Sequence, residues 1–139
     1  MNKKQTITLA SCILGLVLIA GLGGANGQQA APTETKGVTV KQLAAVDLGP
    51  EIEGMKGRQL RMRLVTIEPG GVYAVHNQID RPVTVYVVSG TITEHRGNMV
   101  KEYGAGEAWG ETKESVHWLE NKGTTPTVMI DADIFRQLP

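Results

Sequence analysis

The sequence has a single cysteine, few aromatic residues (two Trp, three Tyr and one Phe) and no excess of charge of either sign. Cys12 lies in an apolar stretch near the start, so the remainder of the chain can form no disulfide and offers no thiolate ligand or nucleophile. The 14 basic residues balance 14 acidic ones, which argues against a nucleic-acid-binding domain. A length of 139 residues suits one domain rather than two.

The first 27 residues have the three-part pattern of a secretory signal peptide. Lys3 and Lys4 give a positive start, residues 7–24 are apolar, and small residues lead to Gly27. We expect cleavage after Gly27, which would make the mature protein periplasmic or secreted, with no membrane span. The alternative is an uncleaved anchor, because the apolar stretch is close to the lower length for spanning a membrane. Cys12 precedes most of this stretch, unlike a lipoprotein cysteine, so we interpret it as an ordinary apolar residue.

The rest of the sequence predicts an all-β domain. Residues 28–57 are interpreted as a polar linker and a first strand, and residues 58–139 as the main barrel. From Arg58 onward apolar and polar residues alternate, and no segment keeps a helical period for three turns. About six to eight short strands, separated by turn signals, indicate a sandwich or barrel. We expect a turn at Glu68–Gly71 and one long strand from Val83 to His95, interrupted once at Gly90.

The three histidines are the residues best suited to carry chemistry. His76 and Gln78 are two positions apart on one expected strand, so their side chains face the same side. His117 lies on a later strand, and side chains from different strands meet inside a small barrel. His95 is separated from Val83 by roughly 40 Å of extended chain. We therefore expect His95 at a surface hairpin, away from the other two.

The spacing of these residues resembles the first motif of the cupin superfamily. That motif has a glycine, a His-x-His pair, a glutamate and a second glycine. The corresponding residues here are Gly70 or Gly71, His76, Gln78, Val83 and Gly90. Gln78 therefore replaces the second histidine, and Val83 replaces the glutamate.

The second cupin motif is matched more simply. Its glycine, its Pro-x-Gly turn, its histidine and its asparagine correspond to Gly106, Thr112–Glu114, His117 and Asn121. The resemblance extends from Arg58 to Phe135 and is strongest to small single-domain bacterial cupins. It implies a double-stranded β-helix, which is a jelly-roll barrel, in one domain.

In cupins that bind metal, the motif residues hold one divalent ion, commonly iron, manganese, zinc, nickel or copper. The resemblance therefore implies His76, Gln78 and His117 as ligands. Two imidazoles and a neutral amide oxygen fall short of the three good ligands of a typical catalytic site. Glu111, six residues before His117, is the best candidate to supply the missing carboxylate. The weaker candidates are Glu107 and Glu114, and the alternative is that all three acids are solvated loop charges.

Several other side chains have simpler interpretations. Val83, Val85 and Val87 share one face of their strand and should line the barrel. Trp118 and Trp109 are expected in packing or at the rim of the pocket. Asn121 should satisfy backbone groups in its turn. Arg81 either meets an anionic ligand at the pocket mouth or is an exposed loop residue.

These residues are compatible with two functional classes, of which the sequence favours the first, with the second as the alternative. The missing histidine and glutamate favour a non-catalytic module that binds or senses a small ligand in a metal-free pocket. The retained pair, His76 and His117, favours a metal-dependent enzyme of the oxygenase, lyase or isomerase type. Cupins often dimerise through their sheets, and an open sheet edge favours pairing, so a homodimer is also expected.

Overall fold

The computed structural model describes residues 29–136, which form eight β-strands and no helix. The expected signal segment, residues 1–27, lies outside the described part of the chain. Within residues 29–136, no helix is long and apolar enough to cross a membrane. The strands are β1 (Lys36–Asp47), β2 (Arg58–Asn77), β3 (Val83–Ser89), β4 (Thr91–Arg96), β5 (Met99–Gly104), β6 (Ala108–Glu111), β7 (Val116–Glu120) and β8 (Thr127–Arg136).

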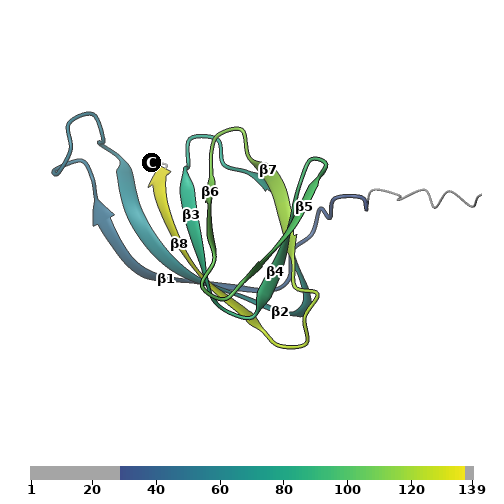
Figure 1. Ribbon diagram of the computed structural model, residues 1–139. Helices are drawn as coiled ribbons and strands as arrows, with labels where there is room; N and C mark the ends of the chain where they lie inside the picture. Colours follow the sequence, from purple (N-terminus) through teal and green to yellow (C-terminus); the bar gives the residue numbers. More distant parts are fainter. Residues whose placement is uncertain (1–28, 137–139) are drawn as a thin grey trace, which may run out of the picture.

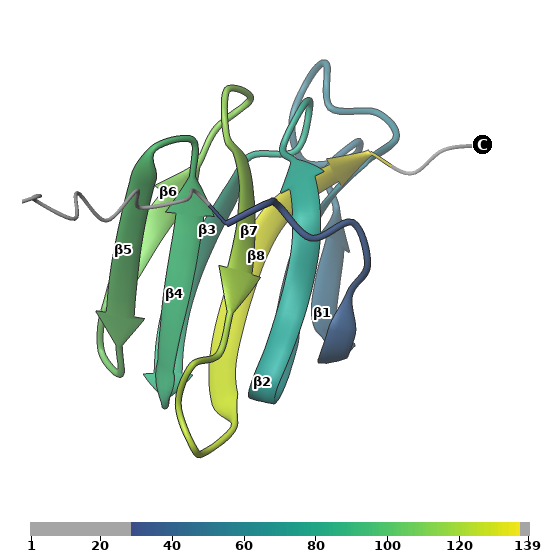
Figure 2. The same ribbon diagram turned by 90° about the vertical axis from the view of Figure 1, so that its right-hand side faces the viewer.

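The strands form one sheet that curls into a nearly closed barrel. Its order is β5-β4-β7-β2-β8-β3-β6, with β1 paired to β2 outside this path. Each strand pair is antiparallel. One wall contains β1, the first half of β2, β8, β3 and β6, and the other contains the end of β2 with β7, β4 and β5 (Figure 1 and Figure 2). The predicted all-β barrel is thus confirmed.

Strand β2 is 20 residues long and belongs to both walls. Its first half pairs with β8, from Arg58 to Ile67, and its end pairs with β7, from Val72 to Asn77. The turn predicted at Glu68–Gly71 is wrong, because these residues stay within the strand and only bend it. A Cβ on Gly71 would lie 2.7 Å from the carbonyl oxygen of Glu68, so the bend requires glycine.

The predicted long strand from Val83 to His95 is divided at Gly90. β3 pairs with β8 and β6, whereas β4 pairs with β5 and β7, so the chain passes between walls at this point. Gly90 has a φ of 79°. A Cβ there would also lie 2.8 Å from the Pro126 carbonyl oxygen. Both the dihedral angle and the close approach explain why the alternating pattern is broken by glycine.

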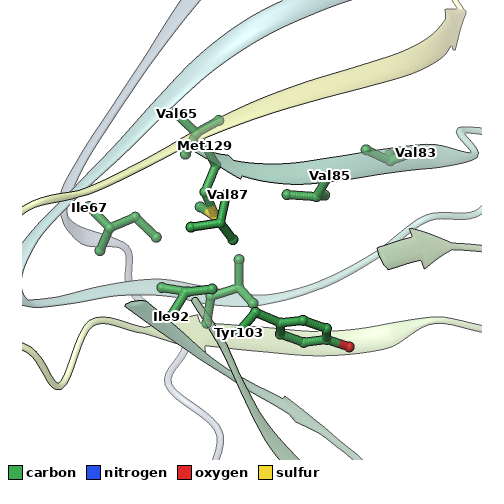
Figure 3. Close-up of a cluster of buried hydrophobic side chains, with 9 residues drawn as sticks. Val65, Ile67, Val83, Val85, Val87, Ile92, Tyr103 and Met129 are labelled. Atoms are coloured by element: carbon green, nitrogen blue, oxygen red, sulfur yellow. The ribbon is translucent and has the colours of Figure 1, made fainter. Parts of the chain in front are cut away.

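The barrel interior is apolar along β3 and at the end where β3 passes into β4. Val83, Val85 and Val87 are 3%, 4% and 0% exposed, so their predicted inward orientation is confirmed. Figure 3 shows side chains of β2, β3 and β8 pointing toward Ile92 and Tyr103 of the opposite wall. This packing leaves the other end of the interior to polar and charged side chains.

Candidate metal centre

Two of the predicted ligands face each other across neighbouring strands. His76 of β2 is directly opposite His117 of β7, and the centroids of their rings are 4.5 Å apart. Glu111, at the end of β6, completes a group in which one ligand atom from each residue lies within 4.8 Å of the others. His117 and Glu111 are 1% and 5% exposed. Glu111 is therefore not the solvated loop charge of the alternative interpretation.

The position of Glu111 explains how the group forms without the motif glutamate. Val83, at the motif position on β3, pairs directly with Glu111 on β6. Directly paired residues project from the same face of an antiparallel sheet. The carboxylate therefore reaches the polar end of the interior from the neighbouring strand.

In both histidines Nδ1 is engaged by an acceptor outside the group, which leaves Nε2 available to it. Nδ1 of His76 is 2.8 Å from the Ala74 carbonyl oxygen, to which it can only donate a hydrogen bond. Nδ1 of His117 is 2.7 Å from a carboxylate oxygen of Glu94. Nε2 of His117 is buried and has no hydrogen-bond partner among the described residues. It lies 3.4 Å from Oε2 of Glu111, so two potential ligand atoms are adjacent.

The Glu111 carboxylate is held from two further directions. Nε1 of Trp109 donates to Oε1 over 2.9 Å, and Nε2 of Gln78 donates to Oε2 over 2.6 Å. The amide oxygen of Gln78 accepts a hydrogen bond from Nε of Arg81 over 3.0 Å. Gln78 thus lies beside the group, with its amide nitrogen toward Glu111 and its oxygen toward Arg81.

Burial and charge act in opposite directions on the ionisable groups here. Burial alone would lower the pKa of His117, but the carboxylates of Glu111 and Glu94 raise it to about 9. Burial would raise the pKa of Glu111, yet His117 and the Trp109 hydrogen bond hold it below its ordinary value. Burial lowers the pKa of His76. In the metal-free protein His117 is therefore the charged member, balanced by two acids.

A cavity of about 10 Å³ adjoins the group. That is roughly the room needed for one water molecule. Its polar lining includes His76, Glu111, Arg63 and Asp131. Arg63 pairs with Asp131 over 2.9 Å, while its Nε is buried without a hydrogen-bond partner among the described residues. Burial, only partly offset by Arg63, raises the pKa of Asp131 to about 6.

His95, the third histidine, lies outside the group, and its ring is held by two neighbouring side chains rather than exposed on a hairpin. The ring of His95 stacks on Trp118 with 3.7 Å between centroids, and its Nε2 is 2.6 Å from Oε1 of Glu120. Trp118 follows His117 in β7 and is itself buried. Both aromatic rings line an open groove that is separate from the small cavity beside Glu111.

The predicted auxiliary residues have well-defined surroundings. The amide of Asn121 bonds to the backbone at Ile67, Thr125 and Gly123, which confirms its expected role in the turn. Arg81 is half-buried and turned toward Gln78, rather than extended from the loop. Val85 lines the small cavity, whereas Glu107 and Glu114 are exposed.

Glu94 is a residue of this site that motif spacing does not identify, as are Arg63 and Asp131. It is 0% exposed and contacts His117. One signal was available, because Glu94 is two residues after Ile92 on the same strand and so shares its inward face. A charged residue there predicts a buried partner of opposite charge or a ligand.

The barrel has counterparts among known proteins. A family model described as "Cupin domain" matches residues 63–133. Among solved structures, KdgF from Halomonas sp. is 17% identical, with a TM-score of 0.59, and the match covers 75% of this chain and 87% of that protein. The polyketide cyclase RemF from Streptomyces resistomycificus is 16% identical, with a TM-score of 0.60, and the match covers 78% and 72% of the two chains.

A third similar structure comes from a different functional class. The cupin domain of an XRE family transcriptional regulator from Enterobacter cloacae is 17% identical, with a TM-score of 0.53, and the match covers 75% of this chain and 99% of that domain. A comparison with curated proteins gave no match. At these identities the structural likeness concerns the fold, and function has to be argued from the site.

Proposed function

Because the chain belongs to the cupin domain family, we propose that the polar end of its barrel is a divalent-metal centre with His76, Glu111 and His117 as ligands. The observation that carries this proposal is the convergence of the three ligand atoms within 4.8 Å of one another. Nε2 of His117 adds to this support, because it is buried, makes no hydrogen bond among the described residues and lies 3.4 Å from Oε2 of Glu111, a second potential ligand atom. A buried polar atom is normally satisfied, and a metal ion would satisfy this one.

The residues present fit such an ion. Two neutral imidazoles and one carboxylate form a donor set used by catalytic zinc and by non-haem iron(II). Since Nδ1 of each histidine faces an acceptor outside the group, Nε2 remains for the metal. The negative charge of Glu111 offsets part of the ion's charge, which neither Gln78 nor Val83 could do.

The function that this centre supports best is that of a metal-dependent enzyme acting on a small molecule. A divalent ion would supply a Lewis acid that polarises an oxygen or activates water or dioxygen. The chain's own residues orient that chemistry: Gln78 and Trp109 restrain the Glu111 carboxylate, and Arg63 and Arg81 place positive charge nearby. Oxygenase, lyase and isomerase reactions are the classes we propose.

The size of the cavity favours a second candidate, a non-catalytic module that binds or senses a small ligand. About 10 Å³ of space accommodates a molecule of water size and no larger organic substrate without side-chain movement. Such a module would keep the same three residues for hydrogen bonding or for a closed metal site. The two candidates differ in whether the metal has an accessible open position.

Metal titration of the purified protein tests the centre itself. We expect one cobalt(II) or zinc(II) ion per chain in the wild type and none in the double variant His76→Ala/His117→Ala. The control is His95→Ala, which removes the third histidine but leaves the three ligands intact. Equal metal content in the wild type and the double variant would rule out this centre.

Nitric oxide distinguishes the two candidate functions, because it is a diatomic probe for open positions on iron(II). The enzyme proposal predicts that the iron(II)-loaded protein binds nitric oxide, giving the electron paramagnetic resonance signal of an iron–nitrosyl complex. An iron-loaded protein that gives no such signal would support the closed, non-catalytic module.

We further propose that two copies of the protein pair through the outer face of β1, β2 and β8. Val46, Leu60 and Met62 are 49%, 45% and 45% exposed on this face. Together with Ala44 and Ala132 they line an apolar groove of about 210 Å³. Contiguous apolar surface of this kind is characteristic of interaction sites.

Export of the protein is also part of the proposal, on the basis of the sequence pattern of residues 1–27. N-terminal sequencing of the protein recovered outside the cytoplasm should begin at Gln28. Recovery of the protein only in the cytoplasm, with Met1 retained, would contradict it.

A further inference from the structure

Glu94 is a fully buried carboxylate at the centre of a hydrogen-bonded cluster. Its Oε1 accepts hydrogen bonds from Nε and Nη2 of Arg96, over 3.0 and 2.6 Å. The same oxygen lies 2.7 Å from Nδ1 of His117. Its Oε2 accepts a hydrogen bond from the Tyr103 hydroxyl over 3.3 Å. These contacts compensate for burying the charge, which would otherwise be costly.

The topology brings this carboxylate to the side of His117 that is remote from the metal ligands. Glu94 lies on β4, which pairs with β7, and its register partner is Leu119, two residues beyond His117 on the same face. The two strands run side by side in Figure 2. Glu94 and Glu111 therefore approach opposite nitrogens of one imidazole ring, with Glu94 at Nδ1 and Glu111 near Nε2.

The two histidines of the centre are held by different acceptors. Nδ1 of His76 faces a neutral backbone carbonyl, that of Ala74. Nδ1 of His117 faces a carboxylate, and a charged acceptor forms the stronger hydrogen bond. A carboxylate behind a metal-binding imidazole fixes its tautomer and orientation and makes it a more basic ligand.

We propose that Glu94 is a positioning residue of the metal centre, which holds His117 with Nε2 toward the metal and strengthens it as a ligand. This inference rests on the proposed metal-binding function. It gives the buried carboxylate of β4 a role in addition to its hydrogen bonds with Arg96 and Tyr103. It also assigns unequal roles to the histidines, with His117 as the stronger ligand.

The test is cobalt(II) binding by Glu94→Gln, a variant that keeps the side-chain shape and removes the charge. We expect one bound ion with an affinity about 10- to 100-fold weaker than in the wild type. The matched control is Glu120→Gln, which alters the other glutamate–histidine pair, between Glu120 and His95, on the outer side of β7. The control should bind cobalt as the wild type does.

Proton NMR of the cobalt-loaded protein provides a readout that a merely structural role would not change. The wild type should give two hyperfine-shifted, exchangeable imidazole N–H signals, one from each Nδ1. In Glu94→Gln the signal of His117 should exchange faster with solvent or be lost, and the signal of His76 should persist. Wild-type affinity together with both protected signals in the variant would overturn the proposal.

A second variant covers the case in which Glu94→Gln does not fold. Glu94→Asp keeps the negative charge but shortens the side chain by one methylene, which withdraws the carboxylate from His117, so it should show the same weakening of cobalt affinity. Undiminished affinity in Glu94→Asp would also count against the proposal. A wild-type protein that binds no cobalt would instead refute the metal centre itself, which separates the two failures.

Discussion

The carboxylate of Glu111 is restrained by Gln78 and Trp109 and lies next to His117. We predict that Glu111→Gln weakens zinc or cobalt binding at least about 100-fold, because losing a ligand should cost no less than losing a residue that only orients one. Equilibrium titration against a competing chelator measures this change. Glu114→Gln is the control, since Glu114 is exposed in the bend that follows. Equal losses in the two variants would exclude Glu111 as a ligand.

The metal-free protein should lose stability as the pH rises from neutral to alkaline. His117 is faced by Glu94 from β4, Glu111 from β6 and His76 from β2, and the two carboxylates raise its pKa from 6.5 to about 9. Because the folded-state pKa is raised, this contribution is complete below pH 6.5 and is lost as the pH passes through about 9. Its size is at most about 3 kcal/mol.

Urea unfolding at pH 7 and pH 9.5, with a chelator present, measures this effect. The zinc-loaded protein is the control, because metal binding requires neutral His117 and should remove the decline. A metal-free protein that is equally stable at both pH values would show that the charged imidazole contributes nothing to stability.

At the scale of strands, Val83 of β3 is paired with Glu111 of β6, so a glutamate at either position should place its carboxylate on the same face of the sheet. We predict that Glu111→Val abolishes metal binding and that the double variant Val83→Glu/Glu111→Val restores part of it. The restored carboxylate would project from β3 onto the same face, at the position of the cupin motif glutamate. Restoration should be incomplete, because Gln78 and Trp109 are arranged around Glu111.

Metal titration of the single and double variants tests whether a carboxylate at position 83 can replace the one at position 111. Val83→Glu alone is the control for the effect of a second carboxylate. If the double variant binds no better than Glu111→Val, the two strand positions are not equivalent.

The sequence predicts the strands well because alternation depends on local order, as in Val83, Val85 and Val87. It predicts the bends poorly. Gly71 is expected in a turn and Gly90 as an interruption of one strand, yet Gly71 lies inside β2 and Gly90 separates two strands, β3 and β4, with different partners. The difference depends on which distant strands pair on either side, and local sequence does not carry that information.

The residues of the candidate site could also be predicted only in part from the sequence. His76 and His117 could be found from motif spacing, and Glu111 could be suggested from its distance to His117. Glu94 could not be identified as easily, because its burial depends on Tyr103 and His117 meeting it from two other strands, β5 and β7. Whether an acid is solvated or buried is a property of tertiary packing.

At the scale of the whole molecule, the apolar outer face of β1, β2 and β8 should determine the oligomeric state. We predict that Met62→Glu shifts a dimer to monomer, because it places an unpaired charge in the proposed interface. Met99→Glu is the control, since Met99 is 39% exposed on β5, compared with 45% for Met62. Sedimentation velocity over a range of protein concentrations measures the shift. A monomeric wild type, or equal effects of both variants, would refute the proposed interface.

The central claim is that one metal ion is held by side chains from three different strands of the barrel. A crystal structure of the cobalt-loaded protein, with the ion located by its anomalous scattering, tests this claim most directly. We predict one ion at about 2.0–2.2 Å from Nε2 of His76, Nε2 of His117 and an oxygen of Glu111. An ion bound elsewhere, or this group empty at saturating cobalt, would contradict the claim.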